Sequence, residues 1–133
     1  MKKTGKNNPS WKGYEKISGA LWSNIRYEAK RRKIHFDITI QEAWELFLNQ
    51  GGLCELSGEI LKFNVGGQSK TSGNASLDRK DSSKGYIKDN CRWTTKIVNR
   101  CKNVLSDTEY ITLCEKVINY NSRDKNDKSE NSY

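Results

Sequence analysis

The stretch Ser76–Asn90, SLDRKDSSKGYIKDN, decides how this chain folds. Its start continues a short apolar segment that predicts a strand over residues 75–77, and its polar, glycine-containing middle predicts a turn over 81–85. Residues 90–93 predict the returning strand. A hairpin needs such a turn, but it does not need an acid, an arginine and a tyrosine beside it. These side chains therefore indicate chemistry.

A helix is predicted directly after this hairpin, because Thr94 or Thr95 can cap a segment whose apolar residues recur at helical spacing. In a strand–turn–strand–helix unit, Asp78 at the end of the first strand can approach Asn99 on the helix. A carboxylate and an amide oxygen are a plausible ligand pair for Mg²⁺, which binds few protein groups. The basic residues that would hold a phosphate beside this ion are Arg79, Arg100 and Lys102.

Helices are predicted on both sides of this unit. One begins at Ser18 and carries apolar residues along one face. A capping box at Thr39–Glu42 starts a second helix, which Gly51–Gly52 stops. Another capping box, Ser106–Glu109, starts a final helix. The expected fold class is therefore α+β, with the hairpin–helix unit flanked by N-terminal helices and a C-terminal helix.

The length of 133 residues, 34% of them hydrophobic, predicts one domain with a modest core. Residues 1–17 are expected to form a flexible basic arm, 18–118 the domain, and 119–133 a disordered polar tail. Between the second helix and the hairpin, residues 53–63 predict two short strands or a turn, and 64–74 a surface loop.

The chain has a formal net charge of +8. A domain this basic either is solubilised by its lysines or binds a polyanion. Its basic residues are unevenly placed, with KRRK at 30–33 at the end of the first predicted helix, which favours nucleic acid over a merely solvated surface. The candidate phosphate contacts on this helix are Arg26, Lys30, Arg31, Arg32 and Lys33.

No apolar run is long enough to span a membrane, and no signal-type segment follows the lysine-rich start. We therefore expect no membrane partner and a cytoplasmic protein, in a bacterial or phage-infected cell. The four cysteines, at positions 54, 91, 101 and 114, form no CxxC pair. This spacing predicts free thiols in a reducing compartment rather than a zinc knuckle or a disulfide framework.

The residues that form a spaced pattern along the hairpin and helix are Asp78, Arg79, Asp81, Gly85, Tyr86, Asn90, Trp93, Asn99 and Lys102. This pattern resembles the HNH endonucleases, whose ββα-metal fold is also called the His-Me finger. It is similar to the variant that lacks the usual base histidine and carries a Gly-Tyr pair, as in small phage and prophage HNH proteins and a rare-cutting HNH restriction enzyme. The motif covers about residues 75–105, and a looser likeness extends from Trp44 to Ile118.

The resemblance implies roles for four residues. Asp78 and Asn99 would hold Mg²⁺, for which Mn²⁺ can substitute, and Asn90 would keep the turn and the active site in shape. Arg79 stands where most family members have the base histidine. Because arginine cannot be deprotonated in a protein, Arg79 would instead hold the phosphate and orient the attacking water.

Tyr86 is then the leading candidate to accept a proton or to position the water through its hydroxyl. An unperturbed phenol has a pKa of about 10, so it needs help from the metal and Arg79 at neutral pH. Alternatively, Tyr86 is a turn aromatic that packs on the hairpin. His35 has two interpretations as well: the resemblance implies an active-site histidine upstream, and its place beside KRRK favours a surface or phosphate contact.

Many HNH proteins brace this unit with a structural zinc held by two CxxC pairs. The corresponding segments here are Cys54–Ser57 and Thr95–Val98, and both pairs are broken. We therefore expect no structural zinc. The apolar residues expected to replace it by packing are Leu53, Leu56, Ile97 and Val98.

Three functional hypotheses follow. The first is a metal-dependent DNA endonuclease that hydrolyses phosphodiester bonds in duplex DNA by nicking or double-strand cleavage. The second is a degenerate HNH-fold DNA-binding module without catalysis, and the third a small basic protein that binds RNA or a partner protein. Cutting a palindrome requires two active sites related by a twofold axis, so a homodimer is an open alternative.

Overall fold

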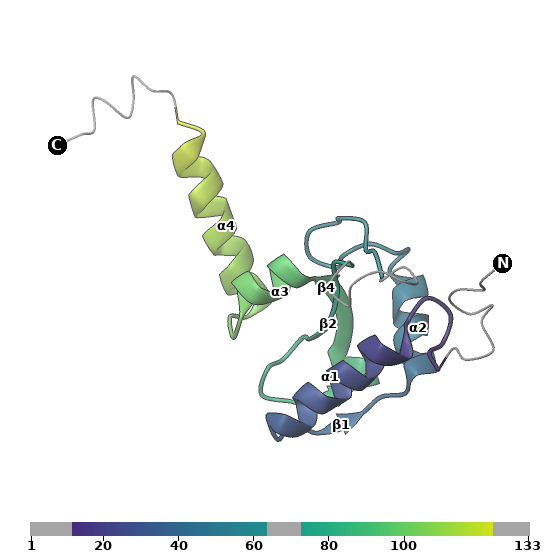
Figure 1. The fold of residues 1–133 in the computed structure, drawn as a ribbon. Helices are drawn as coiled ribbons and strands as arrows, with labels where there is room; N and C mark the ends of the chain where they lie inside the picture. The colour runs from purple at the N-terminus through teal and green to yellow at the C-terminus, as the bar shows by residue number, and fades with distance from the viewer. Residues whose placement is uncertain (1–11, 64–72, 124–133) are drawn as a thin grey trace. The chain divides into compact units, whose positions relative to one another are not determined.

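The structure is a computed structural model that describes residues 12–63 and 73–123 of the 133 (Figure 1). The chain divides after Cys101 into two compact units, Met1–Cys101 and Lys102–Tyr133, and each is described by itself. The segment predicted as one domain therefore spans both units. Most of the predicted arm, loop and tail lies outside the described residues.

A two-stranded antiparallel hairpin forms the centre of the first unit (Figure 1). Strand β2 (Ala75–Arg79) pairs with β4 (Cys91–Thr95), and the register places Leu77 opposite Trp93. This confirms the predicted hairpin: β2 ends two residues later than expected, and β4 starts one residue later and ends two residues later. Because side chains alternate along a strand, Leu77 and Trp93 lie on a mainly apolar face, which also carries Arg79 at its turn end, and the other face carries polar residues.

The apolar face is built around Trp93, which is fully buried. Its indole Nε1 donates a hydrogen bond of 2.7 Å to the Ala43 carbonyl in helix α2 (Ile40–Asn49). Its backbone exchanges two hydrogen bonds of 2.8 Å with the side-chain amide of Gln50, just after α2. The capping box predicted to start α2 is confirmed, since Thr39 and its partner glutamate exchange both hydrogen bonds.

Helix α1 (Gly19–Arg31) begins at Ser18, whose Oγ accepts from Leu21 N at 3.0 Å, as the sequence predicted. It buries Trp22, whose ring lies 5.5 Å from that of Phe36. Phe36 begins β1 (Phe36–Asp37), which pairs in parallel with β3 (Tyr86–Ile87). The sequence did not predict this pairing, because two-residue strands are too short to show a period.

The described part of the predicted arm, residues 12–17, contains local structure. Within its described part, Tyr14 and Ile17 exchange two backbone hydrogen bonds of 2.9 Å. The Ile17 side chain is fully buried. A single isoleucine in polar surroundings has no periodicity, so the sequence could not show that this residue anchors the segment to the first unit.

A short helix, α3 (Lys96–Lys102), follows β4 directly. Thr95 Oγ1 accepts from Val98 N at 3.2 Å, which confirms the predicted cap. Between β3 and β4, residues Lys88–Asn90 form a turn of 3₁₀ helix, η2.

The second unit contains α4 (Asp107–Asn121), which starts at the predicted capping box of Ser106 and Glu109. The helix ends three residues beyond Ile118, so residues 119–121 are helical rather than part of a disordered tail. None of the helices described is long and apolar enough to cross a membrane.

The segment 53–63 forms a turn closed by one isolated β-bridge between Leu53 and Ile60. Cys54 is buried here and its Sγ accepts from Ser57 N at 3.4 Å. Burial favours a higher pKa for the Cys54 thiol, but hydrogen bonds from Ser57, Leu56 and Thr95 outweigh it and hold the pKa below its usual value. All four cysteines are free, as predicted.

The prediction that four apolar residues pack in place of a structural zinc is partly wrong. Leu53 is 41% exposed and Ile97 is 72% exposed, so neither side chain packs in the core. Val98 is buried, together with Cys54 and Leu61. Ile97 faces outward because Val98 takes the inward position on the first turn of α3.

Cys91 provides a pH-dependent test of the core. Burial raises the pKa of its thiol from 9.0 to about 12, with Asp78 adding to the rise and Arg79 and Lys80 opposing it. The native state therefore holds this proton more tightly than the unfolded chain. The corresponding stability is present below pH 9 and should be lost as the pH rises toward about 12. In urea unfolding at a series of pH values, the free energy of unfolding should fall more steeply at alkaline pH in the wild type than in Cys91→Ala. Parallel curves for the two proteins would contradict the raised pKa of Cys91.

Candidate functional site

The second face of the hairpin gathers polar side chains. The cross-strand pairs Ser76–Thr94 and Asp78–Arg92 place four of them on one side of β2 and β4. Asn99 of α3 joins them, because its Nδ2 donates to Ser76 Oγ at 2.9 Å. Ser76 and Asp78 are two residues apart on one strand, a separation of about 7 Å. We call these five residues the polar face. The structure thus brings Asp78 and Asn99 to one side of the hairpin.

A buried ion pair crosses the polar face. Arg92 Nε donates to Asp78 Oδ2 at 3.0 Å, and the two residues are only 3% and 6% exposed. Arg92 Nε also lies 4.0 Å from Glu55 Oε2. Sequence reasoning missed Arg92, because only the strand register shows that it lies opposite Asp78. One oxygen of Asp78 is therefore engaged by a guanidinium.

Three oxygen atoms of the polar face are left without a donor. No described residue donates to Asp78 Oδ1 or to Asn99 Oδ1, and Thr94 Oγ1 is buried without a hydrogen-bond partner among the residues that the structure describes. Within 12–63 and 73–123, no three His, Cys, Asp or Glu side chains are grouped so that they could hold a metal ion. The available donors are thus one carboxylate and neutral oxygens, a set that fits Mg²⁺ with waters or phosphate oxygens completing its shell.

Asn90 closes the turn next to this face. Its Oδ1 accepts from Asp81 N at 3.0 Å, and its Nδ2 donates to the carbonyls of Asp81 and Gly85 at 3.1 and 2.9 Å. Arg79 holds the same turn from its other side, since Nη1 donates to the carbonyls of Ser82 and Lys84, both at 2.8 Å. These bonds fix the conformation of the turn that leads to Tyr86.

The Tyr86 ring lies close to one aromatic and one cationic side chain. Its ring centroid is 5.5 Å from that of Phe36 and 5.4 Å from Arg79 Cζ. Burial raises the pKa of Tyr86, and Arg79 and Arg32 only partly oppose this rise. At neutral pH the side chain is therefore a phenol. This favours a hydroxyl that positions water over a phenolate that accepts a proton, and the contact with Phe36 shows that Tyr86 also packs on its surroundings.

His35 lies beside the same turn through its backbone. Its carbonyl accepts from Tyr86 N at 2.8 Å. Gly85 makes this close approach possible, because a Cβ at this position would lie 2.5 Å from the His35 oxygen and 2.8 Å from the His35 Cβ. The His35 side chain is exposed. The structure thus places the single histidine at the turn rather than apart from it.

Gly85→Ala should destabilise the first unit by about 1–3 kcal/mol, the usual cost of overpacking. The added methyl group would meet the backbone of His35, which cannot move without disturbing β1 and β3. Urea unfolding of this variant should be compared with that of Lys84→Ala, an exposed neighbour in the same turn. Equal stability of the two variants would contradict the close packing of the turn against His35.

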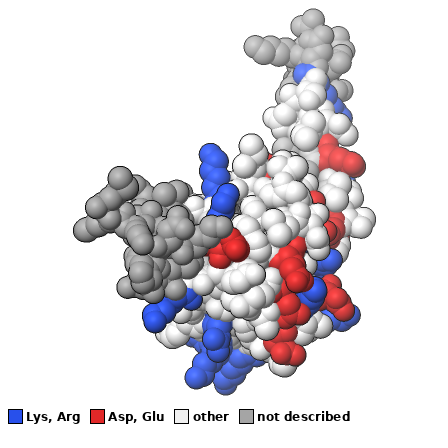
Figure 2. Space-filling model, turned by 90° about the vertical axis from the view of Figure 1, so that its right-hand side faces the viewer, with Lys and Arg blue, Asp and Glu red and all other residues white. Residues whose placement is uncertain are grey.

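The basic end of α1 is exposed. On the face drawn in Figure 2, basic side chains gather at the lower edge, and most acidic side chains lie in a band on the right, with some basic side chains among them. Arg31 is paired with Glu28 by two hydrogen bonds of 3.1 and 2.7 Å, which reduces its availability to a ligand. The other predicted phosphate contacts that are exposed here are Arg26, Lys30, Arg32 and Lys33.

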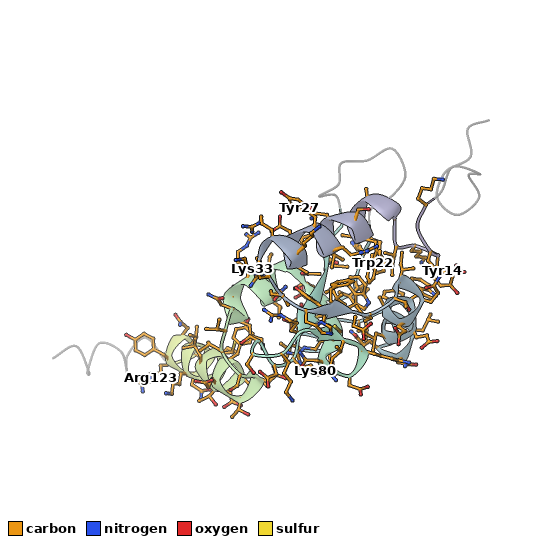
Figure 3. All side chains as sticks on the ribbon, turned by 90° about the horizontal axis from the view of Figure 1, so that it is seen from below. Tyr14, Trp22, Tyr27, Lys33, Lys80 and Arg123 are labelled. Atoms are coloured by element: carbon orange, nitrogen blue, oxygen red, sulfur yellow. The ribbon has the colours of Figure 1, made fainter. Side chains whose placement is uncertain are left out.

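A shallow hollow of about 470 Å³ lies on the outer side of α1. Figure 3 shows Tyr27 on this outer side, whereas Trp22 points inward. Tyr27 is 62% exposed and was not singled out from the sequence. An exposed aromatic residue between two cations suits contact with a nucleotide. The hollow is lined by Ser23, Arg26, Tyr27, Lys30, Ile34 and Phe36.

The two predicted phosphate contacts of α3 differ. Arg100 is exposed. Lys102 is buried, with only 2% of its side chain exposed, and its Nζ lies 3.8 Å from Asp107 Oδ1. A buried, paired lysine cannot reach a phosphate, so Lys102 is removed from the set.

Two antiparallel strands followed directly by a helix that brings an amide to their polar face define an HNH-like α+β fold. The solved structure of the rare-cutting HNH restriction endonuclease PacI, which is described as perturbing DNA, is similar to this chain. The TM-score is 0.54 and the sequence identity is 25%, over 81% of this chain and 82% of that chain. No family model matches the chain. The curated proteins also contain no match.

Proposed function

We propose that this protein is a metal-dependent endonuclease that hydrolyses phosphodiester bonds in duplex DNA. The observation that carries the proposal is the polar face, where Asp78 and Asn99 each keep an oxygen without a donor among the described residues. The similarity to an HNH restriction endonuclease supports it. So does the exposed basic end of α1, whose Arg32 is close enough to influence the pKa of Tyr86.

Asp78 and Asn99 would hold the metal ion through their available oxygens, with the Thr94 hydroxyl beside them. A bound Mg²⁺ or Mn²⁺ stabilises negative charge on the phosphoryl and leaving oxygens. Arg79 would hold the phosphate, because its hydrogen bonds to the described residues use only Nη1 and leave Nε and Nη2 for a ligand.

Activation of the attacking water would fall to the residues around the turn. Tyr86, whose pKa is raised by burial, would orient the water through its hydroxyl. Arg79 cannot accept the proton. An imidazole nitrogen can accept a proton, and His35, whose carbonyl accepts from Tyr86 N at this turn, would take that role.

Phosphate binding by α1 should appear in the salt dependence of DNA affinity. Replacing Lys30 and Lys33 by glutamine removes two exposed cations and should reduce the slope of log K against log salt by about 2. The matched control replaces Lys16 and Lys62, two exposed lysines outside α1, and should leave the slope unchanged. The same slope in both double variants would exclude this end of α1 from the DNA interface.

The experiment that tests the proposed function is cleavage of supercoiled plasmid and genomic DNA in Mg²⁺, Mn²⁺ or EDTA. Metal-dependent nicking or linearisation is expected, and the ratio of nicked to linear product reports whether one or two active sites act together. DNA binding without cleavage of either substrate in any metal would contradict catalysis.

The second candidate is a DNA-binding module without catalysis. Two observations favour it: Asp78 is paired with Arg92, and the pKa of Tyr86 is raised rather than lowered. This candidate predicts the salt-dependent binding described above together with DNA that remains intact in Mg²⁺ and in Mn²⁺.

A further inference from the structure

Arg92 is a buried cation between two carboxylates. Its Nε lies 3.0 Å from Asp78 Oδ2 and 4.0 Å from Glu55 Oε2. The two acids differ in exposure: the Asp78 side chain is 7% exposed and that of Glu55 is 41% exposed. The proposed catalytic roles leave both Arg92 and Glu55 without a function.

The backbone holds Glu55 in place beside this cation. Glu55 N donates to the Trp93 carbonyl at 3.3 Å, so Glu55 is tied to the residue that follows Arg92 on β4. Trp93 is in turn fixed by Gln50 and Ala43. The turn 53–63 therefore presents an acid to the guanidinium from outside the hairpin.

Electrostatics makes this second acid important. A buried arginine that loses its counter-ion destabilises a fold strongly. A divalent cation bound to Asp78 would draw on the same negative charge that neutralises Arg92, and the two positive groups would repel each other across a few ångströms. A second anion can then balance the charge of Arg92, and among the described residues Glu55 is the next carboxylate within reach.

We propose that Arg92 is a positioning residue with two counter-ions: it holds Asp78 in place before the metal binds, and Glu55 carries its charge once the metal has bound. This inference rests on the proposed function. It assigns Glu55 a role in metal affinity although Glu55 does not belong to the metal-binding set. It also predicts opposite effects for the two residues: loss of Glu55 weakens metal binding, and loss of Arg92 strengthens it.

The first test is Mn²⁺ titration of the full chain, followed by electron paramagnetic resonance, for Glu55→Gln and Glu59→Gln. Both residues are exposed acids of the same turn, and both substitutions remove one negative charge. Only Glu55 faces Arg92, so Glu55→Gln should weaken Mn²⁺ binding about five-fold, the scale of a partly exposed ion pair. Equal dissociation constants for the two variants would overturn the inference.

The second test is thermal unfolding of Arg92→Gln in EDTA and in Mn²⁺. This variant should melt below the wild type in EDTA, because Asp78 is then buried without a cation. Its rise in Tm on adding Mn²⁺ should exceed that of the wild type, because a tighter ligand stabilises the native state more. An equal or smaller rise would overturn the inference. If Arg92→Gln does not fold, the comparison of Glu55→Gln with Glu59→Gln decides.

Asp78→Asn separates this inference from the proposed function. If Asp78→Asn abolishes Mn²⁺ binding but Glu55→Gln behaves like Glu59→Gln, the metal site stands and only the role of Arg92 and Glu55 falls. If Asp78→Asn binds Mn²⁺ as the wild type does, the polar face is not the metal site. The proposed function and this inference then fail together.

Discussion

Asp78→Asn should slow DNA cleavage by about 10²- to 10³-fold, since a metal-assisted step loses several kcal/mol of charge stabilisation when a ligand is removed. Asparagine is chosen because it keeps an oxygen that can accept from Arg92 Nε, now at 3.0 Å. Alanine would instead leave the guanidinium buried without this partner and would confuse loss of catalysis with loss of folding. The measurement is the single-turnover rate on plasmid DNA, with DNA affinity measured in parallel.

The matched control is Asp81→Asn. Asp81 is an exposed carboxylate on the same hairpin, where its Oδ1 accepts from the amide and hydroxyl of Ser83. Asp81→Asn removes the same charge, but Asp81 lies outside the polar face. The rate of DNA cleavage should therefore stay within a few-fold of that of the wild type. Equal rates for Asp78→Asn and Asp81→Asn would rule out Asp78 as a metal ligand.

Trp93→Ala should destabilise the first unit by about 3–5 kcal/mol, the cost of removing a large aromatic side chain from a packed core. Trp93 is fully buried, its ring centroid is 5.1 Å from that of Phe63, and its indole bonds to Ala43. The loss therefore combines a cavity with a lost hydrogen bond between the indole and Ala43. Urea unfolding followed by circular dichroism measures the change in the free energy of unfolding.

Trp44→Ala is the comparison for Trp93→Ala. Trp44 stacks on Phe47 with ring centroids 4.8 Å apart, but it is partly exposed rather than buried. Trp44→Ala should therefore lower the free energy of unfolding clearly less than Trp93→Ala does. A larger effect at Trp44 than at Trp93 would place the centre of the core on α2 rather than on the hairpin.

The parts of the fold that local chemistry specifies were predictable from the sequence. The capping boxes at Thr39 and Ser106 marked the starts of α2 and α4, because a serine or threonine three residues before a glutamate satisfies exposed backbone groups by itself. The hairpin was predictable for a related reason, since its turn residues and the strand around Trp93 are close in sequence. In these elements, the residues that determine the structure lie within a few positions of one another.

The parts that depend on distant contacts were not predictable. The pairing of Phe36 with Tyr86 joins segments 50 positions apart (86 − 36), and neither strand is long enough to show alternation. The ion pair of Arg92 depends on strand register, which a pattern of residue types does not reveal. The same is true of the place of His35 at the turn, which Gly85 permits by lacking a side chain.

The central claim is that Asp78 and Asn99 hold a divalent metal on the polar face. Anomalous scattering from crystals grown with Mn²⁺ tests it most directly, because it locates the ion independently of activity. We expect an anomalous peak in direct coordination with Asp78 Oδ1 and Asn99 Oδ1, with Arg92 turned toward Glu55. A Mn²⁺ peak elsewhere, or an intact Asp78–Arg92 pair with no peak beside it at saturating Mn²⁺, would contradict a metal site on the polar face.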